Sequence, residues 1–211
     1  MKLHTFDVLY HVGTLDAAHK GTRGESLEGL GLSVSQCPQA WVRIAKLGGL
    51  PWWQLSKQGN RFLDFHALSA QEQQTYLLWG QSQQLLQPAQ LWQASWYDDE
   101  LQAQCCSLHL SEEQALGEIE EPDSVQAVSG WLGTEKLAQL SGKRKAPFLD
   151  NVEALVAVQY AEFAGLDGVF WNDEPNPSCY SAPRAVIVRP QLASWQIEHC
   201  AENAAPSLDD E

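Results

Sequence analysis

The sequence predicts an α+β fold, in which short strands are spread around helices of modest length. Hydrophobic residues make up 44% of the 211 residues and nine residues are Trp, enough to build a sizeable buried core. Apolar runs typical of strands lie near both ends of the chain, with stretches of helical spacing between them. We place one domain at residues 1–198 and expect an acidic, disordered tail at 199–211.

The strands are predicted from apolar and aromatic runs bounded by Gly, Pro, Asn or Asp. These runs cover residues 6–12, 30–34, 52–55, 61–68, 91–97, 166–171 and 185–188. The runs at 52–55 and 61–68 flank Lys57-Gln58-Gly59-Asn60, so we expect them to pair with each other around this turn. The polar stretch at 16–29 contains several glycines and is predicted to be a loop.

The helices are predicted from their capping residues and prolines. Pro38 suits the first turn of a helix that ends at Gly48. Ser69 and Glu72 form a capping box, which predicts a helix over 71–84. We expect Pro88 to end that helix. Further helices are predicted at 111–117, at 124–131 and, from the capping pair Asp150 and Glu153, as far as 163.

The charge of the chain argues against nucleic acid as a resident partner. There are 27 Asp and Glu against 13 Lys and Arg, a formal net charge of −14. Nucleic-acid binding depends on Lys and Arg at phosphates, and the basic run at 143–145 is too short to supply them. No apolar run approaches the roughly 20 residues that cross a bilayer, and the first residues do not resemble a signal peptide. We therefore expect no membrane contact and a cytoplasmic location.

The five Cys are scattered, and neither they nor the six His have the spacing of a zinc site or a disulfide framework. We expect reduced, mostly buried thiols and no metal site. Cys37 lies near a predicted helix N-terminus, which favours the thiolate. A Cys37 nucleophile with His11 or His66 as its base is therefore an alternative.

Two polar segments could hold a small molecule. The first is Tyr10-His11-Val12-Gly13-Thr14, where a His ring, an unshielded glycine amide and a Thr hydroxyl meet at the end of a strand. These groups can hold a ribose hydroxyl and an amide of a nucleotide. The second is Gly29-Leu30-Gly31-Leu32-Ser33-Val34-Ser35, whose glycines precede a strand, so it is not a Rossmann fingerprint. The alternative is that His11 belongs to the core or its rim and that Gly13 and Thr14 form only a turn.

Together these two segments resemble the ADP-ribosyltransferase superfamily, most closely its diphtheria-toxin and poly-ADP-ribose-polymerase branch. The resemblance implies split antiparallel sheets flanked by helices, with NAD as a substrate. It assigns the NAD adenosine ribose to His11 and the nicotinamide amide to Gly13, with Thr14 and Tyr10 beside them. In the second segment, Gly31, Ser33 and Ser35 match cofactor-binding positions. Ser33 stands where the family often has an aromatic residue that stacks on nicotinamide.

The family also has an acid, usually Glu, at the start of a late strand, where it stabilises the positive charge that develops on the ribose. Arg184 stands there in this chain, before the run at 185–188. The acid would then come from Asp173 or Glu174, in the polar stretch after Trp171. A carboxylate is required because the transition state resembles an oxocarbenium ion. Arg184 would contact phosphate or ribose. The alternative is that Asp173 and Glu174 belong to a plain polar turn.

The resemblance implies transfer of ADP-ribose from NAD to a macromolecular acceptor, with release of nicotinamide. Small domains of this superfamily are often toxins or effectors, which is the setting we expect. A different class of protein also fits: a non-catalytic acidic binding protein of the immunity or inhibitor type, which would occupy a basic surface on a partner. A third possibility is a transferase-like module that binds nucleotide without turning it over.

Overall fold

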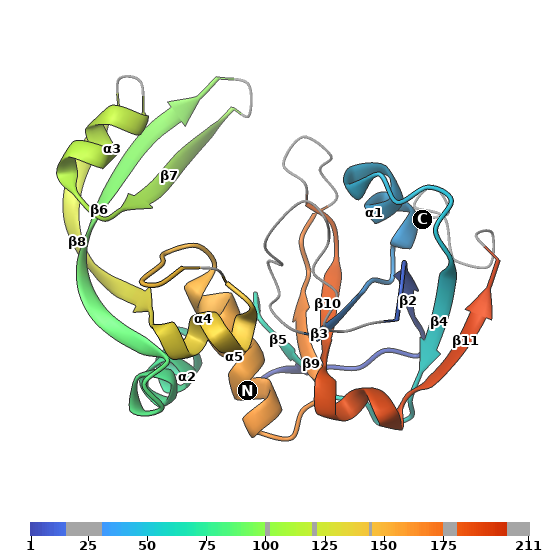
Figure 1. Cartoon of the computed structure of the whole chain (residues 1–211). Helices are drawn as coiled ribbons and strands as arrows, with labels where there is room; N and C mark the ends of the chain where they lie inside the picture. Colours follow the sequence, from blue (N-terminus) through green and yellow to red (C-terminus); the bar gives the residue numbers. More distant parts are fainter. Residues whose placement is uncertain (16–30, 100–101, 120–121, 144, 175–180, 202–211) are drawn as a thin grey trace.

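The computed structural model describes residues 1–15, 31–99, 102–119, 122–143, 145–174 and 181–201 (Figure 1). Its largest sheet has five strands, in which β5 and β9 pair in parallel and the other three pairs are antiparallel. In order across the sheet, the strands are β1 (Leu3–His4), β5 (Phe62–Asp64), β9 (Gly168–Trp171), β10 (Arg184–Val188) and β3 (Gly31–Val34). The predicted loop at 16–29 and residues 202–211 of the predicted tail lie outside the described residues.

A second, three-stranded antiparallel sheet lies beside the first. Its strands, in order, are β11 (Gln196–Cys200), β4 (Trp52–Ser56) and β2 (Leu9–Val12). The two sheets meet where Tyr10 and Ser35 exchange backbone hydrogen bonds of 2.9 and 2.8 Å. A short 3-10 helix, η2 (Arg189–Ser194), leads from β10 of the first sheet to β11 of the second. The bridge at Tyr10 therefore places β2 next to β3.

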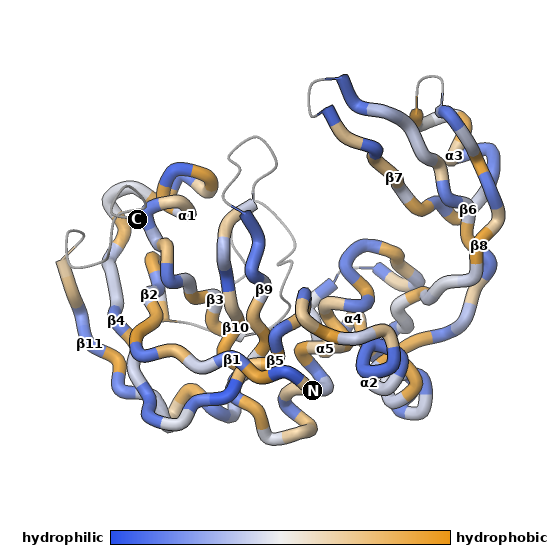
Figure 2. The backbone as a smooth tube through the Cα atoms, turned by 180° about the vertical axis from the view of Figure 1, so that it is seen from behind, coloured by the Kyte–Doolittle hydropathy of each residue, from blue (hydrophilic) through white to orange (hydrophobic). Residues whose placement is uncertain are grey.

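A third antiparallel sheet forms an arm, residues 86–133, that extends away from the other two sheets in both views (Figure 1, Figure 2). It consists of β7 (Ala103–His109), β6 (Leu86–Asp98) and β8 (Ser124–Gly133), with β6 in the middle. Helix α3 (Glu112–Glu118) contacts all three of its strands. Ala94, His109 and Ala115 are buried where this helix and the sheet meet.

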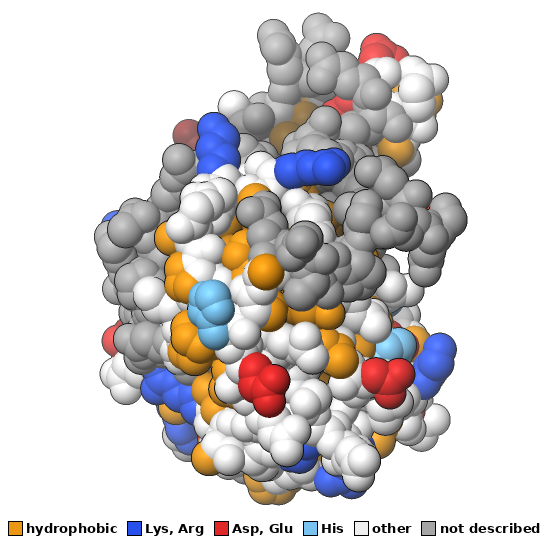
Figure 3. Space-filling view, turned by 90° about the vertical axis from the view of Figure 1, so that its right-hand side faces the viewer, with side chains coloured by type: hydrophobic (Ala, Val, Ile, Leu, Met, Phe, Trp, Pro, Cys, Tyr) orange, Lys and Arg blue, Asp and Glu red, His pale blue; other side chains and the backbone are white. Residues whose placement is uncertain are grey.

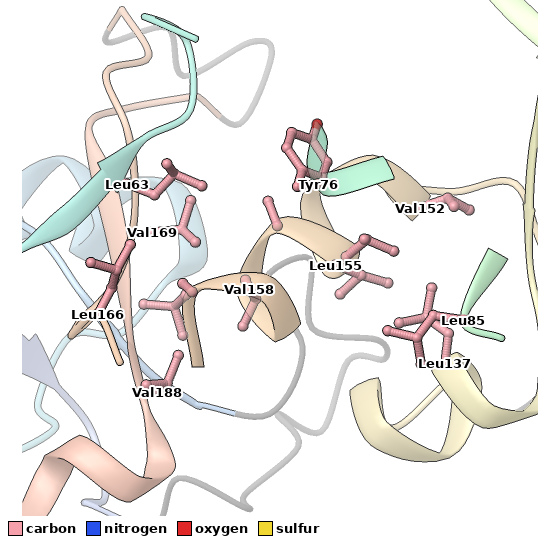
Figure 4. Packing of buried hydrophobic residues seen from close by; sticks show 14 of the residues in the cluster. Leu63, Tyr76, Leu85, Leu137, Val152, Leu155, Val158, Leu166, Val169 and Val188 are labelled. Atoms are coloured by element: carbon pink, nitrogen blue, oxygen red, sulfur yellow. The ribbon is translucent and has the colours of Figure 1, made fainter. Parts of the chain in front are cut away.

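The remaining helices are α1 (Pro38–Ala45), α2 (Ala70–Ser82), α4 (Glu135–Ser141) and α5 (Val152–Phe163). Helix α5 is the centre of the main core. Figure 4 shows its residues Leu155 and Val158 between strand residues on one side and Leu85 and Leu137 on the other. The strands on one side of α5 and the segments that carry Leu85 and Leu137 on the other side all supply apolar side chains. This explains why the sequence of α5 is apolar on several faces. The chain is thus an α+β protein, as predicted, and its strand pairs are antiparallel apart from that of β5 with β9.

Several predicted elements are confirmed with shifted ends. The capping box at Ser69 and Glu72 is present, with the Ser69 hydroxyl accepting from the Glu72 N–H and the Glu72 carboxylate accepting from the Ser69 N–H. Pro38 begins α1, whose C-terminus is the left-handed Lys46 (φ 56°), earlier than the predicted Gly48. Helix α5 forms, but its N-cap is Asn151, without a side-chain capping bond, so the predicted capping by Asp150 and Glu153 is wrong.

The predicted pairing of 52–55 with 61–68 is wrong. Strand β4 lies between β11 and β2, whereas β5 lies between β1 and β9. The physical reason is that the end of the expected turn bonds to distant parts of the chain: Asn60, which is 1% exposed, binds the backbone of Phe6, and the Arg61 N–H donates to Asp167 Oδ2 at 2.8 Å. The side-chain oxygen of Asn60 accepts from the Phe6 N–H (2.9 Å) and its amide donates to the Phe6 carbonyl (2.6 Å) and to the Lys57 carbonyl (2.6 Å).

The predicted helix at 124–131 is also wrong, because this segment is strand β8, paired along β6. Pro88, which was expected to end a helix, lies inside β6 opposite Trp131. A proline fits there because β7 pairs with β6 only from Trp92 onward, so one side of β6 at Pro88 needs no N–H donor. Strands β1, β7 and β11 and helix α4 were not predicted.

Candidate functional site

The first polar segment, 10–14, is held together by the ring of His11. Its Nδ1 lies 2.7 Å from the Ser33 carbonyl oxygen and its Nε2 lies 2.8 Å from the Thr14 carbonyl oxygen. A neutral ring has one N–H, so in a given tautomer it donates to one of these two carbonyls, of Ser33 in β3 or of Thr14 in the turn after β2. Gly13 has a φ of 132°, which L side chains rarely adopt. Its carbonyl accepts from the Trp53 indole N–H at 2.9 Å.

Tyr10 and His11 point to opposite sides of β2, because successive strand residues alternate. The Tyr10 side chain is buried and packs with Trp52, Val42 and Cys200. Burial raises the pKa of the Tyr10 hydroxyl, and the nearby Cys200 raises it further. Tyr10 therefore contributes a neutral, packed ring, and the ring of His11 lies on the other face of the strand.

The second polar segment, 31–35, is packed against β10. A Cβ atom at position 31 would collide with Val186 Cγ2 and would lie 2.7 Å from the Ile187 carbonyl oxygen. The glycine at 31 is thus explained by the close approach of β10, whereas the sequence had suggested approach of a ligand. Ser33 has an exposed side chain. Ser35 is buried, and its hydroxyl donates to the Pro183 carbonyl (2.5 Å) and accepts from the Cys37 N–H (2.9 Å).

Arg184 begins β10, opposite Trp171 in β9. Its guanidinium lies over two indole rings, 5.4 Å from the Trp171 ring centre and 5.9 Å from the Trp41 ring centre. Arg184 Nη1 is 2.9 Å from Asp173 Oδ2, and the two side chains are 18% and 17% exposed. A cation stacked on aromatic rings and paired with a carboxylate has its position fixed from several sides.

Asp173 has a second partner, because its Oδ1 lies 2.8 Å from Nε2 of His66. His66 follows β5 in a short turn. That turn is fixed by Asp64, whose Oδ1 and carbonyl oxygen both accept from the Ala67 N–H, at 3.2 and 3.3 Å. Glu174, the other candidate acid, has an exposed side chain. Of the two acids, Asp173 is the one that the structure places against Arg184.

The structure therefore brings most of the predicted site residues into two groups on neighbouring strands. The first group joins His11, Gly13 and Thr14 to the backbone of Ser33. The second joins Asp173 to Arg184. Strand β3 links them, since it pairs with β10 and is bridged to β2 just after its last residue. His66 and Trp41 complete the second group; no sequence motif marked Trp41 for this site, and His66 had been considered only as a base for Cys37.

No family model, curated protein or solved structure matches the chain. Among the residues that the structure describes, no helix combines the length and apolar character needed to cross a membrane. Within the same residues, no three His, Cys, Asp or Glu side chains are grouped so that they could bind a metal ion. The function must therefore be argued from the geometry of the chain itself.

Proposed function

We propose that this protein binds NAD and transfers ADP-ribose from it to a macromolecular acceptor, with a fold like that of the ADP-ribosyltransferases. One observation carries the proposal. The two segments that resemble the family's motifs lie on β2 and β3, and Arg184, at the position of the family's late-strand acid, begins β10 beside β3. A site assembled from strand ends is the arrangement that the family resemblance requires.

The two groups would contact different parts of an NAD molecule. The resemblance assigns the adenosine ribose to His11 and the nicotinamide amide to Gly13. Both ring nitrogens of His11 face backbone carbonyls and the Gly13 N–H donates to the Pro51 carbonyl at 2.9 Å, so NAD would replace these contacts on binding. Asp173 supplies the carboxylate that the chemistry needs. When the bond from ribose to nicotinamide breaks, the ribose gains positive charge, and a fixed carboxylate lowers the energy of that state. Arg184 holds Asp173 in place through their 2.9 Å contact.

A cytoplasmic setting is part of the proposal. Four of the five Cys lie within the described residues, and all four are free thiols. Free thiols persist in reducing compartments such as the cytoplasm. A toxin or effector role would show itself on expression. We expect the wild-type chain to slow the growth of a sensitive host and Asp173→Asn to be harmless.

The alternative of an acidic binding protein calls for a continuous acidic patch. Figure 3 shows the face seen from the β11 side, where hydrophobic side chains gather in the middle. The Asp and Glu side chains drawn in colour on this face are scattered singly. This face does not offer such a patch.

Calorimetric titration with NAD tests the proposal. Saturable heat is expected with the wild type, and a Kd raised at least about tenfold, about 1.4 kcal/mol, is expected for His11→Ala. Gln126→Ala is the control, because Gln126 is exposed on β8 in the arm, away from the two groups (Figure 1). Near-ultraviolet circular dichroism checks that each variant is folded. A wild type that gives no saturable heat would contradict the proposal.

A further inference from the structure

The pair formed by Asp173 and His66 has the geometry of a base held by a carboxylate. The Asp173 carboxylate lies between two partners, with Oδ2 at Arg184 and Oδ1 at His66. Asp173 is only 17% exposed, whereas the His66 side chain is 48% exposed. The carboxylate is thus largely shielded from water, and the imidazole that it contacts reaches into solvent.

This contact decides which ring nitrogen of His66 carries the proton. A carboxylate can only accept hydrogen bonds, and that of Asp173 is paired with the guanidinium of Arg184. The Nε2 of His66 must therefore be the N–H donor at 2.8 Å. In the neutral ring, Nδ1 then carries the lone pair. Among the described residues, no group forms a hydrogen bond with His66 Nδ1.

The position of His66 is fixed as well as its tautomer. The turn that carries it is closed by Asp64 at the Ala67 N–H and is joined to β9 by the bond from the Phe65 N–H to the Phe170 carbonyl, 2.9 Å. The Phe65 ring lies edge-on to the imidazole, with 5.8 Å between ring centres. A base that is oriented by a carboxylate and held by its backbone is suited to take a proton from a bound group.

We propose that His66 is the general base that activates the acceptor, and that the acceptor is a group that loses a proton as it attacks, such as a hydroxyl; this inference rests on the proposed function. A hydroxyl must lose its proton as it attacks the ribose, so it gains from a base. A carboxylate acceptor is already ionised and needs none. In this proton transfer Asp173 orients the His66 ring and is a positioning residue.

The bond between C1′ of the ribose and the nicotinamide nitrogen breaks, and its electron pair leaves with neutral nicotinamide. The acceptor oxygen forms the new bond to C1′, and its proton passes to His66 Nδ1 and then to solvent. Water can take the place of the acceptor hydroxyl, so NAD hydrolysis measures the same proton transfer without knowledge of the acceptor.

The test measures nicotinamide release from NAD in water for the wild type, His66→Ala, Asp173→Asn and the control Gln126→Ala in the arm. Removing the base is expected to lower kcat about 10²- to 10⁴-fold while the calorimetric Kd for NAD stays within about twofold. Added imidazole is expected to restore part of the His66→Ala rate, which a structural role of His66 would not allow. An unchanged kcat for His66→Ala, or no rescue by imidazole, would overturn the inference.

Nitrogen NMR of the His66 ring tests the same geometry without turnover. Wild-type His66 should carry its proton on Nε2, and Asp173→Asn should weaken that preference. A proton on Nδ1 in the wild type would overturn the inference even if NAD binds. A wild type that does not bind NAD would instead contradict the proposed function itself, so the two failures are distinguishable.

Discussion

Strands β3 and β10 pack so closely at Gly31 that a methyl group has no room. In Gly31→Ala, the new Cβ would collide with Val186 Cγ2 and would lie 2.7 Å from the Ile187 carbonyl oxygen. The Val186 side chain could turn aside, but the carbonyl belongs to the backbone of β10. The variant therefore has to move β3 away from β10. This strand pair connects the two groups of the candidate site.

The expected loss of stability combines two costs. Adding a methyl group to a packed interior costs about 1–3 kcal/mol. Separating the strands weakens a ladder hydrogen bond next to Gly31, worth about 1 kcal/mol. We therefore expect the free energy of unfolding to fall by about 2–4 kcal/mol. For a chain of this size, that corresponds to a Tm lower by about 5–15 °C.

Urea denaturation followed by Trp fluorescence measures this loss. Gly48→Ala is the matched control, because nothing lies within 4 Å of a Cβ at that position, and it should change stability by less than about 0.5 kcal/mol. Val186→Ala should cost less in the Gly31→Ala background than in the wild type, since it removes one of the two collisions. A Gly31→Ala protein as stable as the wild type would refute the close packing of β3 and β10.

Three further predictions concern the frame around the site. Asn60→Ala removes the side-chain partner of two buried backbone groups of Phe6 and of the part-buried Lys57 carbonyl, and chemical denaturation should show a loss of about 2–4 kcal/mol; a loss under about 0.5 kcal/mol would contradict the role of this residue. Asp167→Asn removes the charge that faces Lys57 at 2.5 Å and should cost about 1–3 kcal/mol in the same assay, with less sensitivity to salt than the wild type. The hydrogen bond from the chain's amino group, followed by those from the backbone and side chain of Ser69, lowers the pKa of Glu72 from 4.5 to about 2. The stability that Glu72 adds is therefore present above pH 4.5 and lost as the pH falls through about 2. Thermal melts should show a smaller acid-side loss in Glu72→Gln, and equal acid profiles would contradict the assignment.

Elements that are specified by neighbouring residues could be predicted from the sequence. The capping box at Ser69 and Glu72 needs only a four-residue segment, and it forms as expected. Strands β2, β3 and β10 are made of apolar runs, and they were predicted as well. Elements whose stability depends on a distant partner were missed or wrong. The segment at 124–131 is a strand because β6 pairs with it, and its own residues did not show this.

In the candidate site, too, contacts within one short segment could be predicted, whereas contacts between distant segments could not. The turn held by His11 lies within one short segment, so its residues could be recognised together. The contact between His66 and Asp173 joins residues 107 positions apart, and no local spacing predicts it. Gly31 shows a third case, in which the residue was singled out for ligand approach but the structure explains it by packing against β10.

The most direct test of the proposed NAD site follows the nine Trp indole signals by nitrogen NMR during titration with NAD. The indole of Trp53 donates to the Gly13 carbonyl, and that of Trp41 lies beside Arg184. Both signals are expected to shift in a saturable manner, while Trp79, between helices α2 and α5, and Trp92, in the arm, stay unchanged. No shifts, or shifts confined to Trp79 and Trp92, would contradict the proposed NAD site.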